Sequence, residues 1–376
     1  MSADTTPIIP DTFCPAKWDE LYVSFETNYA YSCCKAPPAQ HFTEHVLEFV
    51  SMERMNMLNG IQDASCAYCW EVEHNGGKSL RHRHLQNFDP ATFNSYKNNP
   101  DPKLVQVTVG NECNFQCTYC NPKFSSKWEQ DVRQAPYKVF SDRYFWGIDP
   151  KNGDVMDKNI EFLKSFKHIE KLSVVGGEPL FNKKEFQLLD AVSADKLQMV
   201  TNLSCKKDTL HKLFKRCEDY QAVVLIVSID ATGPIAEFAR YGLNFAEFDS
   251  NFRYLLNYRP PNVKVIVNSV MSNITVRDFE NFSKYMEPFL STPKFEWRVE
   301  YCKNPTTQSM ATLPEQYKES ICIAIDRMKQ YNVWGLDTLK TVVSTTPFNK
   351  NMHSQMKHFM QEFAKRKNID IPICLD

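Results

Sequence analysis

The stretch that decides the fold is Leu104-Val-Gln-Val-Thr-Val-Gly-Asn-Glu-Cys-Asn-Phe-Gln-Cys-Thr-Tyr-Cys120, in which an apolar run leads directly into three cysteines. The β-branched residues of Leu104–Val109 are typical of a buried strand, so the cysteines follow on the loop that leaves its carboxyl end. Cys113, Cys117 and Cys120 have the spacing C-x3-C-x2-C. Three thiolates can bind three irons of a cubane 4Fe–4S cluster, whereas simple electron-transfer clusters usually take four cysteines. The alternatives are a zinc knuckle and three unrelated thiols.

Composition favours a globular protein that binds metal. The 376 residues are 43% hydrophobic, and the net charge of −1 gives no electrostatic reason to expect nucleic acid or an acidic ligand. No apolar run approaches the ~20 residues of a membrane helix, and the N-terminus lacks a signal peptide. Without an export signal, 13 cysteines are more typical of metal ligands and free thiols than of disulfides. We therefore expect a cytoplasmic protein without a membrane partner.

From Leu104 onward, strand-like and helical segments alternate. The expected strands are Leu104–Val109, Lys171–Val175, Leu197–Thr201, Val223–Ile229, Val263–Val270 and Phe295–Tyr301. The expected helices are Ser125–Arg133, Lys183–Ala194, Lys207–Cys217, Phe245–Tyr258, Val276–Met286 and Pro314–Gln330, with one more in the tail at Met352–Lys365. Six βα units predict an α/β fold with a parallel sheet, helices outside it and functional groups at the carboxyl ends of its strands. A long aromatic-rich insertion is expected at about 134–168.

Residues 1–100 have a different pattern. Trp18–Tyr31 alternates like a hairpin with a turn at Thr27-Asn28, and Thr43–Leu58 is expected to be helical. A second set of cysteines brackets these elements, at Cys14, Cys33, Cys34, Cys66 and Cys69. A cysteine before a hairpin, others after it and a later C-x2-C predict a small α+β knuckle closed by metal.

The chain resembles the radical S-adenosylmethionine (SAM) superfamily at two motifs. One is the cysteine triad with the aromatic Tyr119 before its last cysteine, and the other is Gly176-Gly177-Glu178-Pro179 after the second strand. The resemblance implies that the triad holds a catalytic 4Fe–4S cluster whose open iron is chelated by SAM, and that Glu178 binds the SAM amino group. Reductive cleavage of SAM would then give a 5′-deoxyadenosyl radical that abstracts hydrogen from a substrate.

Further positions resemble SAM contacts of the family's peptide-modifying branch. They lie at or after strand ends: Asn202, Ser228 and Asp230 near the ribose and carboxylate, Arg240 on the carboxylate, and Asn268 in a similar role. A guanidinium suits a carboxylate because it can bind in bidentate fashion. Each of these residues could instead be an ordinary polar residue at a strand end.

The N-terminal cysteine set resembles the twitch domain, a shortened SPASM domain that carries an auxiliary Fe–S cluster. Cys14, Cys66 and Cys69, with Cys33 or Cys34, would complete a four-thiolate site, although structural zinc would also suit four cysteines. The chain departs from the family pattern because the module precedes the barrel and has no glycine in its hairpin turn.

Together these features predict three domains: residues 1–100 as the twitch-like module, 103–305 as the partial (β/α)6 TIM-like barrel that the resemblance implies, and 306–376 as a helical extension. The resemblance implies a radical SAM enzyme supplied by a low-potential electron donor such as flavodoxin or ferredoxin. A peptide or protein substrate is the first expectation, a nucleoside, sugar nucleotide or small metabolite is the second, and a large RNA is disfavoured by the charge. From another class, the chain could be a non-catalytic zinc-binding adaptor.

Overall fold

The structure is a computed structural model that describes residues 7–27, 29–36, 46–99, 101–137 and 155–375, without the side chains of 46–49. The expected turn residue Asn28, the helix start at Thr43 and residues 138–154 of the expected insertion therefore lie outside the described residues. The chain divides into two compact units. Unit 1 comprises residues 1–110, 150–175 and 184–197, and unit 2 comprises 111–149, 176–183 and 198–376. These bounds differ from those of the three expected domains, which remain a prediction.

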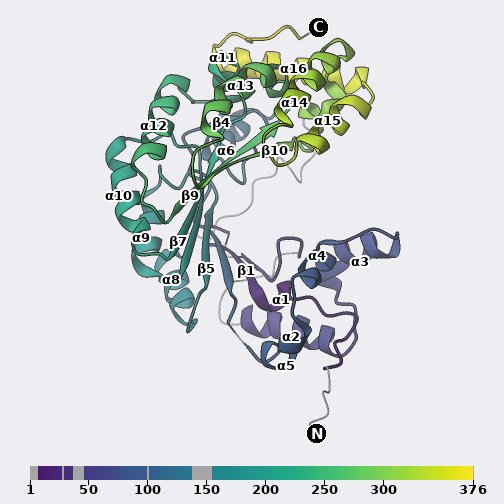
Figure 1. Ribbon diagram of the computed structural model, residues 1–376, viewed down its shortest axis with the longest axis vertical. Helices are drawn as coiled ribbons and strands as arrows, with labels where there is room; N and C mark the ends of the chain where they lie inside the picture. Colours follow the sequence, from purple (N-terminus) through teal and green to yellow (C-terminus); the bar gives the residue numbers. More distant parts are fainter. Residues whose placement is uncertain (1–6, 28, 37–45, 100, 138–154, 376) are drawn as a thin grey trace. The chain divides into compact units, whose positions relative to one another are not determined.

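Unit 1 contains four adjacent strands (Figure 1). Their order is β5 (Lys171–Val175), β3 (Leu104–Thr108), β1 (Glu20–Ser24) and β2 (Tyr29–Tyr31). β1 and β2 pair antiparallel, which confirms the predicted hairpin. β1 also pairs in parallel with β3, Leu21 opposite Val105 and Val23 opposite Val107, and all four of these side chains are buried. The N-terminal hairpin thus adds to the edge of the parallel strands. The pairing of β1 with β3 is long-range, and no local sequence pattern predicts it.

The helices of unit 1 are α1 (Ala16–Asp19), α2 (Val46–Leu58), α3 (Ala67–His74), α4 (Leu80–Gln86), α5 (Phe93–Tyr96), α8 (Met156–Lys164) and all but the first residue of α9 (Lys183–Ala191). Side chains of α1, α2 and α5 form a largely aromatic core with Phe13, beside the first cysteine of the second set. The ring of Phe13 lies 5.1 Å from those of both Trp18 and Phe93, measured between centroids. Because Cys14 follows Phe13, this core fixes the backbone at that cysteine.

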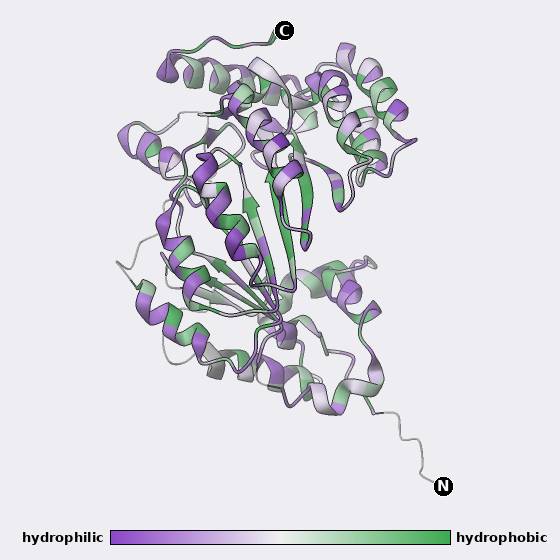
Figure 2. Cartoon of the chain, turned by 60° about the vertical axis from the view of Figure 1, so that its left-hand side comes forward, coloured by the Kyte–Doolittle hydropathy of each residue, from purple (hydrophilic) through white to green (hydrophobic). Residues whose placement is uncertain are grey.

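Unit 2 contains the remaining long strands in the order β6 (Lys196–Thr201, in unit 2 from Gln198), β7 (Ala222–Ser228), β9 (Val263–Met271) and β10 (Phe295–Tyr301). β9 pairs in parallel with both β7 and β10. The strands are the most apolar segments in Figure 2, as expected where helices cover a parallel sheet. All six predicted strands are present within a residue or two, so the prediction of a mixed α/β fold with mostly parallel strands, consistent with a partial TIM-like barrel, is confirmed.

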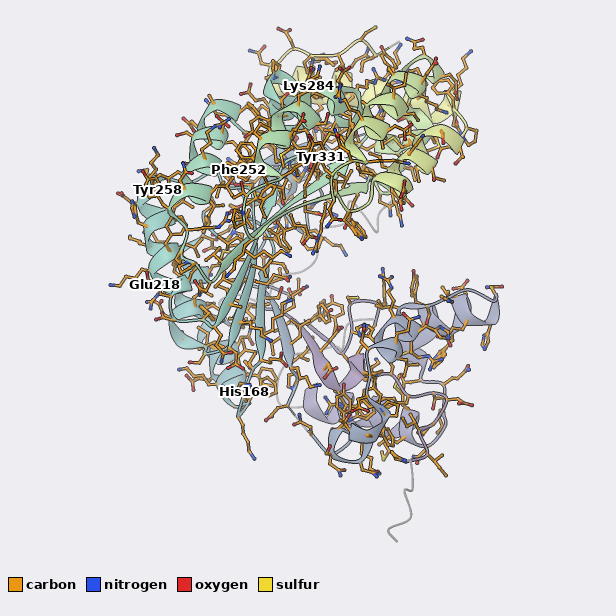
Figure 3. The ribbon with its side chains drawn as sticks, viewed as in Figure 1. His168, Glu218, Phe252, Tyr258, Lys284 and Tyr331 are labelled. Atoms are coloured by element: carbon orange, nitrogen blue, oxygen red, sulfur yellow. The ribbon has the colours of Figure 1, made fainter. Side chains whose placement is uncertain are left out.

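The helices of unit 2 also largely follow the predictions. They are α6 (Ser126–Gln134), α10 (Lys207–Cys217), α11 (Gly233–Ala239), α12 (Phe245–Tyr258), α13 (Phe279–Met286), α14 (Lys318–Met328), α15 (Leu336–Thr345) and α16 (Lys350–Lys367). α12 is amphipathic: Phe252 is buried, whereas Tyr258 at the helix end is exposed (Figure 3). The pattern did not predict α11, α15 or the short strand β8 (Arg240–Tyr241). Among the described helices, none is both long and apolar enough to span a bilayer.

The C-terminal helix α16 supports the cysteine loop from behind. Trp128 on α6 is fully buried, and its ring centroid lies 5.7 Å from that of Phe363 on α16. The indole Nε1 of Trp128 donates a 2.8 Å hydrogen bond to the carbonyl of Cys117. The tail is therefore part of the packing that positions the cysteines.

We expect Phe363→Ala to lower the free energy of unfolding by about 3–5 kcal/mol, because the substitution leaves a cavity beside Trp128. Urea unfolding followed by tryptophan fluorescence measures the loss. The matched control is Phe181→Ala, whose side chain is 56% exposed, with an expected change within about 0.5 kcal/mol. Equal losses in the two variants would contradict this packing role.

Candidate active site

The three cysteines lie on a loop that is held closed by its own polar residues. The side-chain amide of Asn111 donates to the carbonyl of Pro122 at 2.8 Å and to Glu129 at 2.7 Å. Ser125 caps α6 by accepting from the Trp128 amide, while its hydroxyl donates to the carbonyl of Phe115 at 2.7 Å. These contacts join both ends of the loop to the first turn of α6. Asn111 and Ser125 were not among the predicted site residues, although an N-cap serine before the helix was a readable signal.

A second segment of unit 2, residues 240–242, packs against the cysteine loop. β4 (Gln116–Cys117) pairs antiparallel with β8, with Cys117 opposite Arg240. A Cβ on Gly242, whose φ is +106°, would lie 2.7 Å from the carbonyl oxygen of Asn114. Glycine is therefore required here both for its backbone conformation and for the close approach of the cysteine loop.

The Gly-Gly-Glu turn packs directly on the cysteine loop. A Cβ on Gly177 would lie 2.1 Å from the carbonyl oxygen of Glu112, and the Glu178 amide donates to that oxygen at 2.8 Å. Gly176 has φ +135°, which an L side chain rarely adopts. The group that approaches Gly177 most closely is therefore the protein's own backbone.

Glu178 is a buried carboxylate surrounded by hydrogen-bond donors. Its oxygens accept from the Thr201 hydroxyl at 2.6 Å, the Asn202 amide at 2.5 Å and the Leu180 amide at 3.0 Å. Burial nevertheless raises the pKa of Glu178 to about 7, because these bonds only partly replace water. A cation placed beside this carboxylate would favour its charged form. Such an environment suits the recognition of an ammonium group.

Asp230 joins four segments through one carboxylate. Both of its oxygens bind Arg240, at 2.8 Å to Nε and 2.9 Å to Nη2. It also accepts from the hydroxyl of Tyr119 and, at 2.8 Å, from the amide of Val270 on β9. The third guanidinium nitrogen of Arg240 is 3.9 Å from the Cys117 sulfur. Arg240, expected to bind the SAM carboxylate, thus makes its bidentate pair with Asp230, and any contact with SAM remains a prediction.

The other predicted SAM contacts lie in unit 2 with these groups. The side chain of Asn202 donates to the side-chain oxygen of Asn114 at 2.9 Å, so it ties the end of β6 to the cysteine loop. Ser228 ends β7, and Asn268 pairs beside it on β9. Pro179 completes the Gly-Gly-Glu turn and is buried. Asn114 was missed by the sequence analysis because an asparagine between two cysteines has no distinctive spacing.

The chemistry of the triad fits thiolate ligation of iron. Burial and the charge of the neighbouring Cys117 raise the pKa of Cys113 to about 12, and burial raises that of Cys117 to about 11. Binding to a metal would replace the protons that these buried thiols retain. No three cysteine, histidine or acidic side chains stand at metal-binding distance of one another within the described part of the chain. The fit therefore rests on the donor type and the shared loop.

The second cysteine set lies wholly in unit 1. Cys14, Cys33 and Cys69 are buried, Cys66 is half-buried and Cys34 is exposed. Burial raises the pKa of Cys14 to about 12, and the nearby thiols of Cys66 and Cys69 act in the same direction. A hydrogen bond from Cys33 lowers the pKa of Cys34 to about 6. Thiols alone make up this donor set, which suits zinc as well as an Fe–S cluster.

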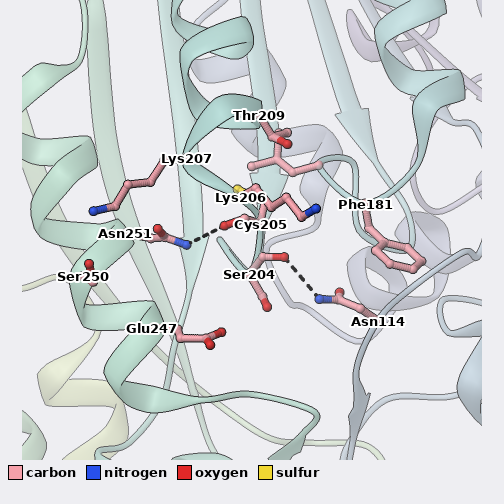
Figure 4. Close-up of a pocket in the computed structure, with 11 residues that line it drawn as sticks. Asn114, Phe181, Ser204, Cys205, Lys206, Lys207, Thr209, Glu247, Ser250 and Asn251 are labelled. Atoms are coloured by element: carbon pink, nitrogen blue, oxygen red, sulfur yellow. Dashed lines mark hydrogen bonds between the residues drawn. The ribbon is translucent and has the colours of Figure 1, made fainter.

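An open pocket of about 660 Å³ lies next to the cysteine loop and the Gly-Gly-Glu turn. It is lined by Asn114, Leu180, Phe181, Ser204, Cys205, Lys206, Lys207, Thr209, Glu247, Ser250 and Asn251 (Figure 4). Its volume is in the range of small-molecule sites. Lys207 lies over the ring of Tyr254, whereas the Lys206 ammonium makes no ion pair with a described residue. The pocket thus offers a cation and the exposed ring of Phe181.

The chain has similarities to known proteins. Residues 107–286 match the family model described as the radical SAM superfamily. The GTP 3′,8-cyclase of Helicobacter pylori strain J99 is 26% identical over 129 residues, which are 34% of this chain and 34% of the cyclase. The matched part thus spans about a third of that curated relative.

Solved structures give weaker likenesses. Streptococcus suis SuiB bound to SAM has a TM-score of 0.41 at 13% identity, covering 87% of this chain and 72% of SuiB. SuiB bound to its precursor peptide SuiA has a TM-score of 0.40 at 14% identity, covering 72% and 61%. TYW1 with a lysine–pyruvate adduct has a TM-score of 0.31 at 12% identity, covering 60% and 73%. TM-scores this low say nothing about the ligands of this chain.

We expect Gly177→Ala to separate the Gly-Gly-Glu turn from the cysteine loop, because the added methyl would overlap the Glu112 carbonyl. Overpacking of this kind costs about 1–3 kcal/mol of stability. Urea unfolding and the iron content after anaerobic reconstitution should both decrease. Gly110→Ala is the matched control, since its Cβ would meet nothing nearer than 3.9 Å. Normal stability and iron content in Gly177→Ala would show that the close approach is unimportant.

Proposed function

Because residues 107–286 of this chain form a radical SAM domain, we propose that the protein is an enzyme that uses a 4Fe–4S cluster and SAM to remove a hydrogen atom from a peptide or protein side chain. The observation that carries the proposal is the convergence in unit 2 of the cysteine loop, the Gly-Gly-Glu turn and the buried Asp230–Arg240 pair. When bound, the cluster and SAM supply the electron transfer and the radical. The protein supplies ligands, orientation and shielding from water.

Each convergent group has a role in this proposal. Cys113, Cys117 and Cys120 hold the cluster, and the carboxylate of Glu178 binds the SAM ammonium. Arg240, fixed by Asp230, places a positive charge beside the Cys117 sulfur, where it stabilises the thiolate. Tyr119 is fixed by the same carboxylate, which restricts the backbone between the second and third cysteines. The site is thus preorganised by buried contacts before any cofactor binds.

A peptide substrate is supported by the resemblance of residues 13–80 to the twitch module, which implies an auxiliary cluster beside a peptide-modifying barrel. The open pocket of about 660 Å³ beside Asn114 is where we propose that such a substrate binds. A nucleotide is the second candidate, because the curated relative is named for an activity on GTP. The ammonium of Lys206, which has no ion pair among the described residues, could bind phosphate. A low-potential donor such as flavodoxin or ferredoxin would supply the electron in either case.

We expect Cys117→Ala to abolish SAM cleavage by anaerobically reconstituted protein, because the triad supplies every protein ligand of the catalytic cluster. Production of 5′-deoxyadenosine, measured by chromatography, is the readout. The matched control is Cys66→Ala/Cys69→Ala, which should lose the metal of the second set and keep uncoupled SAM cleavage. Continued cleavage by Cys117→Ala would refute the assignment of the triad as the catalytic cluster site. No cleavage by the reconstituted wild-type protein would instead favour a zinc-binding adaptor.

The substrate class can be tested by hydrogen transfer. We expect deuterium from a fully deuterated peptide pool to appear in 5′-deoxyadenosine, because the radical takes its hydrogen atom from the substrate. Deuterated GTP should transfer none, and Cys117→Ala with the peptide pool is the control. Mass spectrometry detects the deuterium. If deuterium came from GTP and not from the peptide pool, the substrate would instead be a nucleotide.

A further inference from the structure

Lys17 is a lysine whose ammonium lies in the interior of unit 1. Its side chain is 1% exposed, and its three N–H groups are all used. They donate to the Ser32 hydroxyl at 2.6 Å, to the Ser65 hydroxyl at 2.8 Å and to the Glu53 carboxylate at 2.9 Å. An ammonium is rarely buried to this degree unless its charge has a specific partner.

The partners of Lys17 come from the segments that carry the second cysteine set. Ser32 immediately precedes Cys33-Cys34, and Ser65 immediately precedes Cys66 in the C-x2-C segment. The Lys17 amide itself donates to the carbonyl of Cys14 at 3.2 Å. Lys17 therefore contacts all three cysteine-bearing segments. Cys14 and Cys66, in the first and last of these segments, are 52 positions apart in the chain.

The serines continue this network outward. The Ser65 hydroxyl accepts from Lys17 and donates to Asp63 at 2.6 Å, and Asp63 also accepts from the Asn56 side chain at 2.7 Å. The orientation of the segment before Cys66 is thus fixed through Lys17 and Asp63 together. On the other side, the second oxygen of Glu53 is buried and has no hydrogen-bond partner among the described residues.

Stability does not account for this arrangement. Replacing a buried ion pair with apolar residues of similar size is often neutral or stabilising, because the charges lose their water. The Glu53 carboxylate, 2.9 Å away, keeps the buried ammonium charged. Because the ammonium also contacts Ser32 and Ser65, the residues immediately before Cys33 and Cys66, the cation lies close to two of the cysteine segments.

We propose that Lys17 is the positioning residue of the second cysteine set: it aligns the three cysteine-bearing segments and supplies the positive charge that stabilises their thiolates when they bind metal. Four thiolates around Zn²⁺ carry a net charge of −2, and a four-thiolate 4Fe–4S site is also anionic, so a nearby cation favours either occupant. The inference rests on the part of the proposed function that makes these cysteines a metal site, and it is independent of the substrate.

The test uses the full chain with Cys113, Cys117 and Cys120 replaced by Ala, so that only the second set can offer several thiolates to metal. Co²⁺ is titrated anaerobically, and its thiolate charge-transfer band reports binding. The variants are Lys17→Met and Lys17→Met/Glu53→Met. The second leaves no unpaired buried charge, so we expect it to retain the fold. Lys78→Met is the matched control, because Lys78 is exposed and has no hydrogen bond or ion pair with the described residues of the cysteine segments.

We expect both Lys17 variants to bind Co²⁺ about 10- to 100-fold more weakly than the parent, as is typical when a residue that supports metal ligands is removed. The pH at which half of the Co²⁺ is bound should also rise, since thiols without the cation keep their protons to higher pH. If Lys17 only stabilised the fold, a double variant with the melting temperature of the parent would also have the parent's Co²⁺ affinity and pH midpoint. Parental affinity and pH midpoint in the double variant would overturn the proposal.

Failure of the premise is distinguishable from failure of the enzyme assignment. A parent that binds neither Co²⁺ nor reconstituted iron would overturn the role of Lys17, because the cysteines would not form a metal site. SAM cleavage by the protein with its triad intact would still support the radical SAM assignment. Conversely, if the protein with its triad intact did not cleave SAM but the second set bound Co²⁺ normally, the radical SAM assignment would fail and the role of Lys17 could still hold.

Discussion

The carboxylate of Asp230 is the contact on which the geometry of the candidate active site depends. It follows β7, and it binds Arg240 on β8, Tyr119 on the cysteine loop and the backbone amide of Val270 on β9. Taking a carboxylate and a guanidinium out of water costs several kcal/mol each, and only a complete set of hydrogen bonds offsets this. Because four segments must meet to complete that set, the buried pair selects one arrangement of the loop. Removing either partner would leave an uncompensated charge beside the cysteines.

Each of the two cysteine sets has a buried cation beside it that is paired with a carboxylate. In unit 2 the Asp230–Arg240 pair directs one guanidinium nitrogen at Cys117, and in unit 1 the Lys17–Glu53 pair lies between the segments of Cys33 and Cys66. Both cations are buried and each is held by a carboxylate, so the positive charge cannot move away from the sulfurs. Metal–thiolate centres are anionic, and fixed charge at short range is a strong influence on their stability and redox properties.

Backbone contacts contribute as much to the site as charged groups. Gly177 and Gly242 both lie where a side chain would collide with the cysteine loop, at the carbonyls of Glu112 and Asn114. The loop is thus clamped between two glycine-containing turns and supported from behind by Trp128 and α16. A loop that is restrained on three sides can present its sulfurs to a cofactor with little loss of conformational entropy on binding. The C-terminal helix, remote in sequence, is in this way part of the active-site scaffold.

The sequence by itself determined the strands and most helices, and it named the candidate site residues. Hydrophobic alternation and capping are local properties, which is why β7, β9 and α12 could be read from the chain. The triad and the Gly-Gly-Glu turn were visible because their chemistry needs fixed spacing. Only the tertiary structure decided that β1 pairs with β3, that Arg240 binds Asp230 and that Lys17 contacts three cysteine segments. These contacts join residues separated by many positions, and no local pattern encodes them, because they form only when the folded chain buries the groups together.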